Sequence, residues 1–235
     1  MALASLLFVA DCEPYAGEVA PLLQPVTPSA VAAPEPGAFG PPRPEPPALE
    51  VAWAKALPAL RVECANTGAQ AEVRLYDDDG SVNPLAVDAF SQVAADANGP
   101  FPLQERVVRL AVKAARYFDA KTLVVVSGYR KPRTKAPPDH HAKGEALDFR
   151  LPGVDYRKLA AYLRSLPRVG VGVYTDSRTR YVHLDVRDRS FHWLDASPPG
   201  VTWREAALPD AKQAARDAAY TDESDLPLDH AVAAR

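Results

Sequence analysis

Cysteine is scarce in this sequence: only Cys12 and Cys64 occur among its 235 residues. Two cysteines do not make the disulfide framework that holds small secreted domains together, and neither lies in a CxxC metal spacing. The sequence is compatible with a single bridge between them and equally with two unbonded thiols. Cysteine usage therefore does not indicate the redox compartment.

Long apolar runs and excess positive charge are also lacking. No run of about 18 apolar residues occurs, so we predict no transmembrane helix. A net charge of −3 and a pI near 6.0 leave no broad basic surface, which argues against a nucleic-acid partner. The start, Met1 to Ala10, resembles the apolar part of a signal peptide without the positive residues that precede it. It is either a truncated or cleaved export signal or simply an apolar N-terminus.

Proline, by contrast, is abundant, and many of the 24 prolines lie between Pro14 and Pro47. Proline removes amide donors and favours extended polyproline conformations, so this segment cannot bury enough apolar surface to fold. We expect residues 1–50 to be an apolar start and a mostly disordered, semi-rigid tether. We expect residues 51–205 to form the catalytic domain and residues 206–235 to form a peripheral tail.

Periodicity predicts a mixture of strands and helices within the domain. Asn83 followed by Pro84 is typical of a helix start, a capping residue before proline at the first helical position. We expect strands at 60–65, 71–76, 123–127, 146–150, 169–174 and 180–187, and helices at 83–97, 103–118, 155–165 and 211–219. This order indicates an α+β fold rather than a doubly wound sheet.

Three histidines lie in two short segments that also carry carboxylates. Alternate side chains of a strand share a face. Over 181–187 the valines and leucine should face the core, so His183 and Asp185 should share the opposite face. By the same logic Leu147 and Phe149 should face the core and Asp148 should face away from it.

These residues suggest a metal site. His141 precedes the predicted strand at 146–150, and Gly144 allows a tight turn between His141 and that strand. Two histidines and one carboxylate leave a fourth tetrahedral position open for water, as a catalytic zinc needs. Such ligands also fit other divalent metals, whereas zinc is the default for hydrolysis. A His-x-Asp pair on a strand is commonly a surface pair, so spacing alone leaves the metal site and the surface pair both open.

Four motifs together resemble one known family. In order they are Ser127-Gly128-Tyr129-Arg130, then HxxGxAxD from His141 to Asp148, then GxGxY from Gly170, then Val182-His183-x-Asp185. They resemble the YcbK-like murein endopeptidases, relatives of the zinc D-Ala-D-Ala peptidases and of the hedgehog signalling domain. The resemblance spans roughly Leu75 to Trp193. It implies an α+β fold with a small antiparallel sheet flanked by helices, and one zinc ion held by His141, Asp148 and His183.

The resemblance also implies a function: a zinc metallopeptidase that hydrolyses an amide bond in peptidoglycan stem peptides or their cross-links, as an endopeptidase or carboxypeptidase. We expect a monomer in the cell envelope or periplasm. Arg130 would pair with a substrate carboxylate or the scissile carbonyl oxygen, with a structural salt bridge as its alternative. Ser127 and Tyr181 are assigned to substrate binding. Asp185 would be the general base or would orient a ligand imidazole.

Departures from the family pattern keep two alternatives open. Asp139 stands where many relatives have serine, Arg180 where other branches have an acid, and Tyr181 where many have histidine. They leave the general base open, and the missing acid at Arg180 keeps one rival open, a zinc-stabilised module that binds cell-wall peptides without turnover. A metallopeptidase or amidase with another substrate is the third option. We expect His192 to be a surface histidine beside a packing tryptophan rather than a residue of the cleft.

Overall fold

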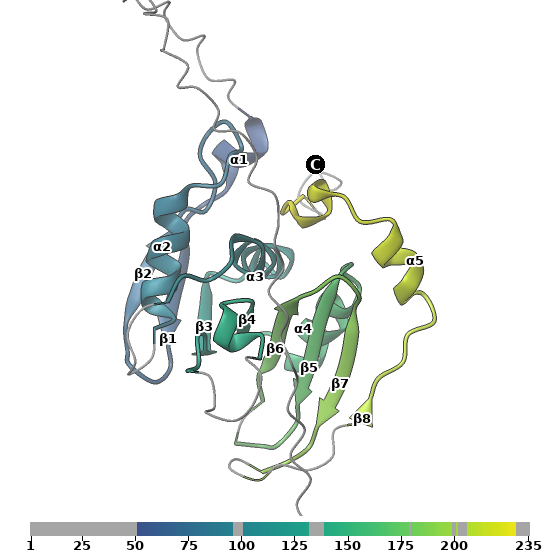
Figure 1. Cartoon of the computed structure of the whole chain (residues 1–235). Helices are drawn as coiled ribbons and strands as arrows, with labels where there is room; N and C mark the ends of the chain where they lie inside the picture. The colour runs from purple at the N-terminus through teal and green to yellow at the C-terminus, as the bar shows by residue number, and fades with distance from the viewer. Residues whose placement is uncertain are drawn as a thin grey trace, which may run out of the picture. The chain divides into compact units, whose positions relative to one another are not determined.

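An eight-stranded sheet forms the frame of the computed structural model, in the strand order β2-β1-β3-β4-β6-β5-β7-β8 (Figure 1). The structure describes residues 51–95, 101–131, 139–178, 180–198, 201 and 206–228. The predicted tether, which contains Cys12, and residues 132–138 lie outside these residues. The division of the chain at residues 50 and 205 stays a prediction.

The sheet is mixed. Its strands are β1 (Leu60–Cys64), β2 (Gln70–Val73), β3 (Thr122–Ser127), β4 (Ala146–Arg150), β5 (Val169–Tyr174), β6 (Val182–Val186), β7 (Phe191–Asp195) and β8 (Ala206–Ala207). β1 pairs with β3 and β5 pairs with β7 in parallel, whereas the other neighbours are antiparallel. The α+β class is confirmed. The sheet is larger than the expected small antiparallel one, because the N-terminal hairpin and β7 both join it through parallel pairs.

The four predicted helices are present close to where the periodicity places them, and a short helix at Ala52–Ala56 was not predicted. They are α1 (Ala52–Ala56), α2 (Pro84–Val93), α3 (Glu105–Tyr117), α4 (Tyr156–Arg164) and α5 (Gln213–Ala218), with 3-10 turns η1 (His141–Lys143) and η2 (Asp222–Asp225). The side chain of Asn83 accepts hydrogen bonds from the amides of Leu85 and Ala86, as its capping role predicts. The predicted end of this helix near residue 97 falls outside the described residues.

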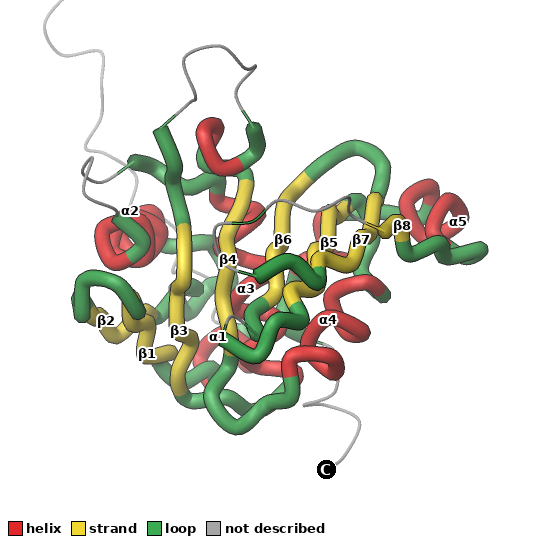
Figure 2. Tube along the Cα trace, turned by 90° about the horizontal axis from the view of Figure 1, so that it is seen from below, coloured by secondary structure: helices red, strands yellow, loops and turns green. Residues whose placement is uncertain are grey.

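Helices α3 and α4 lie on one side of the central strands (Figure 2). Leu147 and Phe149 of β4, and Val182, Leu184 and Val186 of β6, belong to the apolar core on this side. The period of two therefore turns Asp148, His183 and Asp185 toward the other face of the sheet, as predicted. Helices α3 and α4 therefore cover one face of the central strands, and Asp148, His183 and Asp185 project from the other face.

The C-terminal segment is fastened to the domain by polar contacts. The carboxylate of Asp217 accepts hydrogen bonds from the amide of Arg168 at 2.6 Å and from the amide and hydroxyl of Ser190 at 2.7 and 2.6 Å. Asp225 is fully buried and accepts a hydrogen bond from Arg106 Nε at 2.8 Å.

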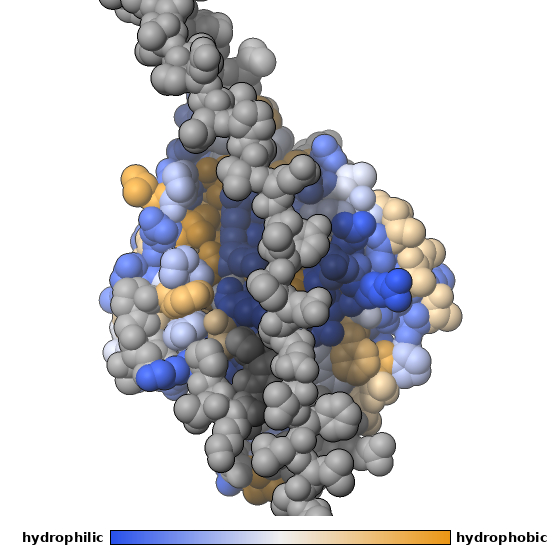
Figure 3. All heavy atoms as spheres, viewed as in Figure 1, coloured by the Kyte–Doolittle hydropathy of each residue, from blue (hydrophilic) through white to orange (hydrophobic). Residues whose placement is uncertain are grey.

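The alanine-rich α5 forms a pale edge in the space-filling view, whereas hydrophilic residues gather toward the middle of that face (Figure 3).

No helix in the described part of the chain has the length and apolar character needed to cross a membrane.

Candidate metal centre

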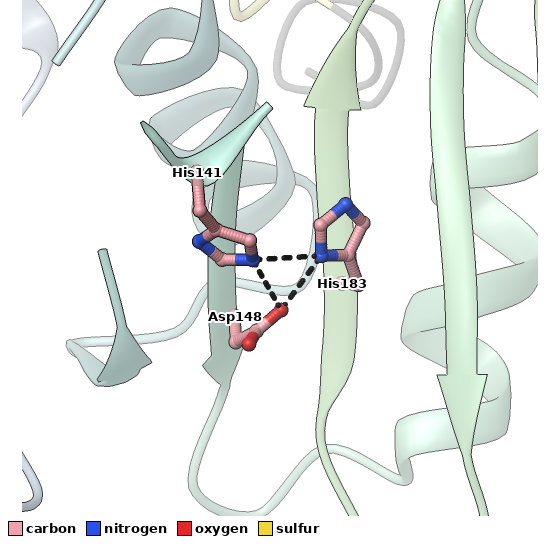
Figure 4. A group of neighbouring side chains, drawn as sticks. All are labelled: His141, Asp148 and His183. Carbon is pink, nitrogen blue, oxygen red and sulfur yellow. Dashed lines mark hydrogen bonds and ion pairs between the residues drawn. The ribbon is translucent and has the colours of Figure 1, made fainter. Parts of the chain in front are cut away.

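Three side chains from separate elements converge on one point. His141 comes from η1, Asp148 from β4 and His183 from β6, and their ligand atoms all lie within 4.8 Å of one another (Figure 4). All three side chains are buried, with 1%, 3% and 6% of their surface exposed. The structure thus brings together the three residues that the sequence offers as candidate metal ligands.

Strand register and a tight turn bring them together. Asp148 and His183 lie directly opposite each other across the β4–β6 pair. Gly144 has φ of +72°, a conformation that side-chain-bearing residues rarely adopt, and a Cβ there would collide with the carbonyl oxygen of Pro102. Glycine at this position therefore lets the chain turn from η1 into β4, so that His141 faces Asp148.

Hydrogen bonds behind the two imidazoles determine which nitrogens face the centre. His141 Nδ1 donates to the carbonyl oxygen of Gly128 at 2.6 Å, and His183 Nε2 donates to the carboxylate of Asp185 at 3.0 Å. In the neutral rings, His141 Nε2 and His183 Nδ1 then carry lone pairs, and these atoms lie 3.1 Å apart. Two lone pairs and the oxygen of Asp148 thus point at the same space. Such an arrangement could bind a cation.

The electrostatics of the isolated protein agree with this reading. Burial alone would raise the pKa of Asp148, but the imidazoles of His141 and His183 hold it well below its usual range. Burial would lower the pKa of His183, but its bonds to Asp148 and Asp185 raise it to about 9. The pocket therefore favours positive charge, and a proton on His183 supplies it when no metal ion does.

The spacing of the donors also fits a small tetrahedral ion. His183 Nδ1 lies 2.8 Å and His141 Nε2 lies 3.3 Å from Asp148 Oδ1, and the two nitrogens are 3.1 Å apart. Bonds of about 2.0–2.2 Å at tetrahedral angles place neighbouring ligand atoms roughly 3.3–3.6 Å apart. Small shifts of the side chains would bring all three atoms to that separation. Two imidazoles and a carboxylate are a typical zinc donor set.

Asp185 lies behind the centre and is fully buried. Its carboxylate accepts from His183 Nε2, from Arg187 Nε at 2.5 Å and from Arg187 Nη2. These bonds lower its pKa to about 2, against the opposing effect of burial. Gly170 faces this pair, and a Cβ there would collide with both Asp185 and Arg187.

The predicted substrate-binding residues lie beside the centre in different environments. Ser127 is half-buried and lies opposite Asp148 across the β3–β4 pair. Tyr181 is half-buried and stacks on Tyr174 at 4.4 Å, and burial together with the charge of Asp148 raises the pKa of its hydroxyl. Arg130 is exposed, and no hydrogen bond joins its side chain to another described residue. The structure thus places Ser127 and Tyr181 near the carboxylate of Asp148, and Arg130 at the surface.

Sequence reasoning missed β7 and misplaced His192. Trp193 of β7 lies 5.1 Å from the ring of His183, measured between ring centroids. His192 is only 1% exposed, so its expected surface position is wrong. As its neighbours Phe191 and Trp193 share the face of the metal centre, alternation turns His192 into the layer behind the sheet. The Phe-His-Trp triplet could have been read as a short strand by its aromatic content.

Residues 53–193 match the family model Peptidase_M15_2, described as peptidoglycan L,D-endopeptidase MepK. The match covers more than half of the chain. The chain belongs to this family. No curated protein and no solved structure matched it.

Membership in the MepK family confirms the resemblance drawn from the four motifs, and it makes the chain a peptidoglycan peptidase. The matched span includes all three residues of the metal centre, together with Asp185 and Arg130. Peptidoglycan is a cell-envelope polymer, which indicates where such an enzyme acts. The donor set described above is one that could hold a metal ion.

Proposed function

We propose that this protein is a zinc-dependent endopeptidase that hydrolyses an amide bond in the cross-links between peptidoglycan stem peptides. The observation that carries the proposal is the convergence of two imidazole nitrogens and one carboxylate oxygen on a single point, within the span matched by the MepK family. Zinc is the metal that best suits this donor set in a hydrolase. The periplasm is the compartment we propose.

His141, Asp148 and His183 would hold the zinc ion, which supplies Lewis acidity toward the scissile carbonyl and the attacking water. The carbonyl of Gly128 and the carboxylate of Asp185 hold the two imidazoles in the tautomers that binding requires. Arg130, exposed beside the centre, would take a substrate carboxylate or the developing oxyanion through its planar donors. Ser127 and Tyr181 would contact the peptide on either side.

For Asp185 the geometry favours orientation over proton transfer. Its oxygens are taken up by His183 and Arg187, and it has no exposed surface. The imidazole of His183 lies between the carboxylate of Asp185, bonded to Nε2, and the point of convergence, which Nδ1 faces. A general base needs to be within about 3 Å of the proton, or within reach through one water. We therefore propose Asp185 as a positioning residue.

A digest of purified peptidoglycan, analysed by liquid chromatography and mass spectrometry, tests the function. Protein loaded with zinc should convert cross-linked dimers to monomers, chelator should stop the conversion, and added zinc should restore it. The Asp148→Ala variant is the matched control and should be inactive throughout. Release of a single amino acid instead would indicate a carboxypeptidase. Stoichiometric zinc with intact dimers would indicate a binding module and would refute the proposal.

A further inference from the structure

One row of positions crosses the polar face of the sheet through the metal centre. Asp148 of β4 lies opposite His183 of β6, His183 lies opposite Gly172 of β5, and Gly172 lies beside Trp193 of β7. The third position of this row carries no side chain. The space that a side chain would fill is taken by the indole of Trp193.

Gly172 is required here by space and not by backbone conformation. Its φ lies outside the positive range, so alanine could adopt the same backbone. However, a Cβ on Gly172 would lie 2.6 Å from Cε2 and from Cζ2 of Trp193 and 2.9 Å from its Nε1. Real Cβ atoms do not approach ring atoms this closely, so even a methyl group would push the indole away.

The indole in turn packs against a metal ligand. Its ring centroid lies 5.1 Å from that of His183, with the planes inclined at 51°, and Trp193 is only 8% exposed. Phe191, two residues earlier on β7, stacks with the indole at 5.9 Å, also measured between ring centroids. No described residue accepts a hydrogen bond from the buried Nε1 of Trp193. Buried indoles usually have a hydrogen-bond partner for this group. Since this one has none among the described residues, packing against neighbouring rings is what holds Trp193 in place.

Two different contacts therefore restrain the imidazole of His183. The hydrogen bond from Nε2 to Asp185 limits rotation of the ring in its own plane, and the indole blocks its tilt toward β5. We propose that Trp193, admitted by Gly172, is a positioning residue that holds His183 in its metal-binding orientation. This inference rests on the proposed zinc function. It assigns a specific purpose to the second glycine of the GxGxY motif.

Zinc affinity of purified protein, measured by competition with a chromophoric chelator, tests the inference without using activity. Trp193→Val and Gly172→Ala should each weaken zinc binding about 10–100-fold, the usual cost of losing a group that orients a ligand. Trp193→Phe should have a smaller effect, because it keeps an aromatic ring. Trp53→Phe is the matched control, since Trp53 contacts Tyr76 and not the centre, and should bind zinc like the wild type.

The double variant Gly172→Ala/Trp193→Val gives the sharpest result. Once the indole is gone, the added methyl group has room, so the double variant should bind zinc no more weakly than Trp193→Val alone. Additive losses would refute the idea that Gly172 acts by admitting Trp193. Unchanged zinc affinity in all Trp193 variants, with only a lower urea midpoint, would reduce the residue to ordinary packing and refute the inference.

A spectroscopic measurement covers the case in which these variants do not fold. The sequence holds three tryptophans, so Trp53→Phe/Trp203→Phe leaves Trp193 as the only one. Its emission should change in step with zinc occupancy, because the ion binds to the imidazole that the indole contacts. Constant emission during demonstrated zinc uptake would contradict the inference. If the wild-type protein takes up no zinc, the proposed function fails instead.

Discussion

Replacing Asp185 by asparagine separates two roles that one carboxylate could play. Asparagine keeps the shape of the side chain but removes the charge that faces His183 and Arg187. The asparagine side chain has one acceptor oxygen and one donor NH2 group. Its NH2 group must therefore face either His183 Nε2 or the Arg187 guanidinium, both of which are donors themselves. As a result either the tautomer of His183 or the pairing of Arg187 is lost, inside a site with no exposure to water at position 185.

The expected magnitude follows from these contacts. Loss of the group that orients a ligand imidazole costs about 10–100-fold in zinc affinity, or about 1.4–2.7 kcal/mol. The free energy of unfolding of the metal-free protein should fall by ~1–3 kcal/mol, because a buried donor of Arg187 or His183 loses its acceptor. Turnover at saturating zinc should recover much of its wild-type value, because a positioning residue acts through occupancy and orientation of the ion.

The assay pairs zinc competition with dimer cleavage over a range of free zinc. Asp188→Asn is the matched control: this neighbouring aspartate is exposed, so its loss should change neither quantity beyond about 0.5 kcal/mol. An Asp185→Asn variant with wild-type zinc affinity, and with turnover lowered about 10²–10⁴-fold at every zinc concentration, would refute the positioning role. That pattern is what loss of a general base produces.

Four further outcomes are expected. Asp148→Ala should abolish zinc binding and the thermal stabilisation that zinc gives, as measured by metal analysis and melting curves. Arg130→Ala should raise KM or lower kcat for dimer cleavage while zinc affinity stays unchanged, which separates substrate contact from metal binding. Asp225→Ala should lower the free energy of unfolding in urea by ~3 kcal/mol, because it leaves a partly buried arginine without its partner. Burial and the nearby charge of Arg164 lower the pKa of His192 to about 4, so the unfolded chain binds this proton more tightly. The free energy of unfolding should therefore fall by up to ~3 kcal/mol as pH drops from about 6.5 to about 4, and His192→Phe should flatten that part of the profile.

Local pattern was sufficient for most helices and strands and for the faces of β4 and β6. Alternation in Ala146–Arg150 and Val182–Val186 placed apolar side chains toward the helices, and a period of two leaves no other choice for Asp148 and His183. The cap at Asn83 likewise depends only on adjacent residues. Strand faces and helix caps depend on interactions within a few residues of the chain, so they can be predicted from the sequence directly.

Contacts between distant segments could not be read in this way. Arg106 and Asp225 are 119 positions apart, and neither flanking pattern indicates that they form a buried ion pair. The parallel pairing of β7 with β5 also joins separate segments, and this pairing brings the indole of Trp193 next to His183. The same alternation that exposes Phe191 buries His192, but only once the strand itself is recognised.

By itself the sequence determined the α+β class, the candidate ligand types and the face from which the two candidate ligands on strands project, because each depends on spacing along a few residues. Only the tertiary structure decided which strands are neighbours, and hence that Asp148 lies opposite His183 and that Trp193 fills the space over Gly172. These are properties of strand order in the sheet. Strand order is set by the packing of the whole domain, not by any segment of it.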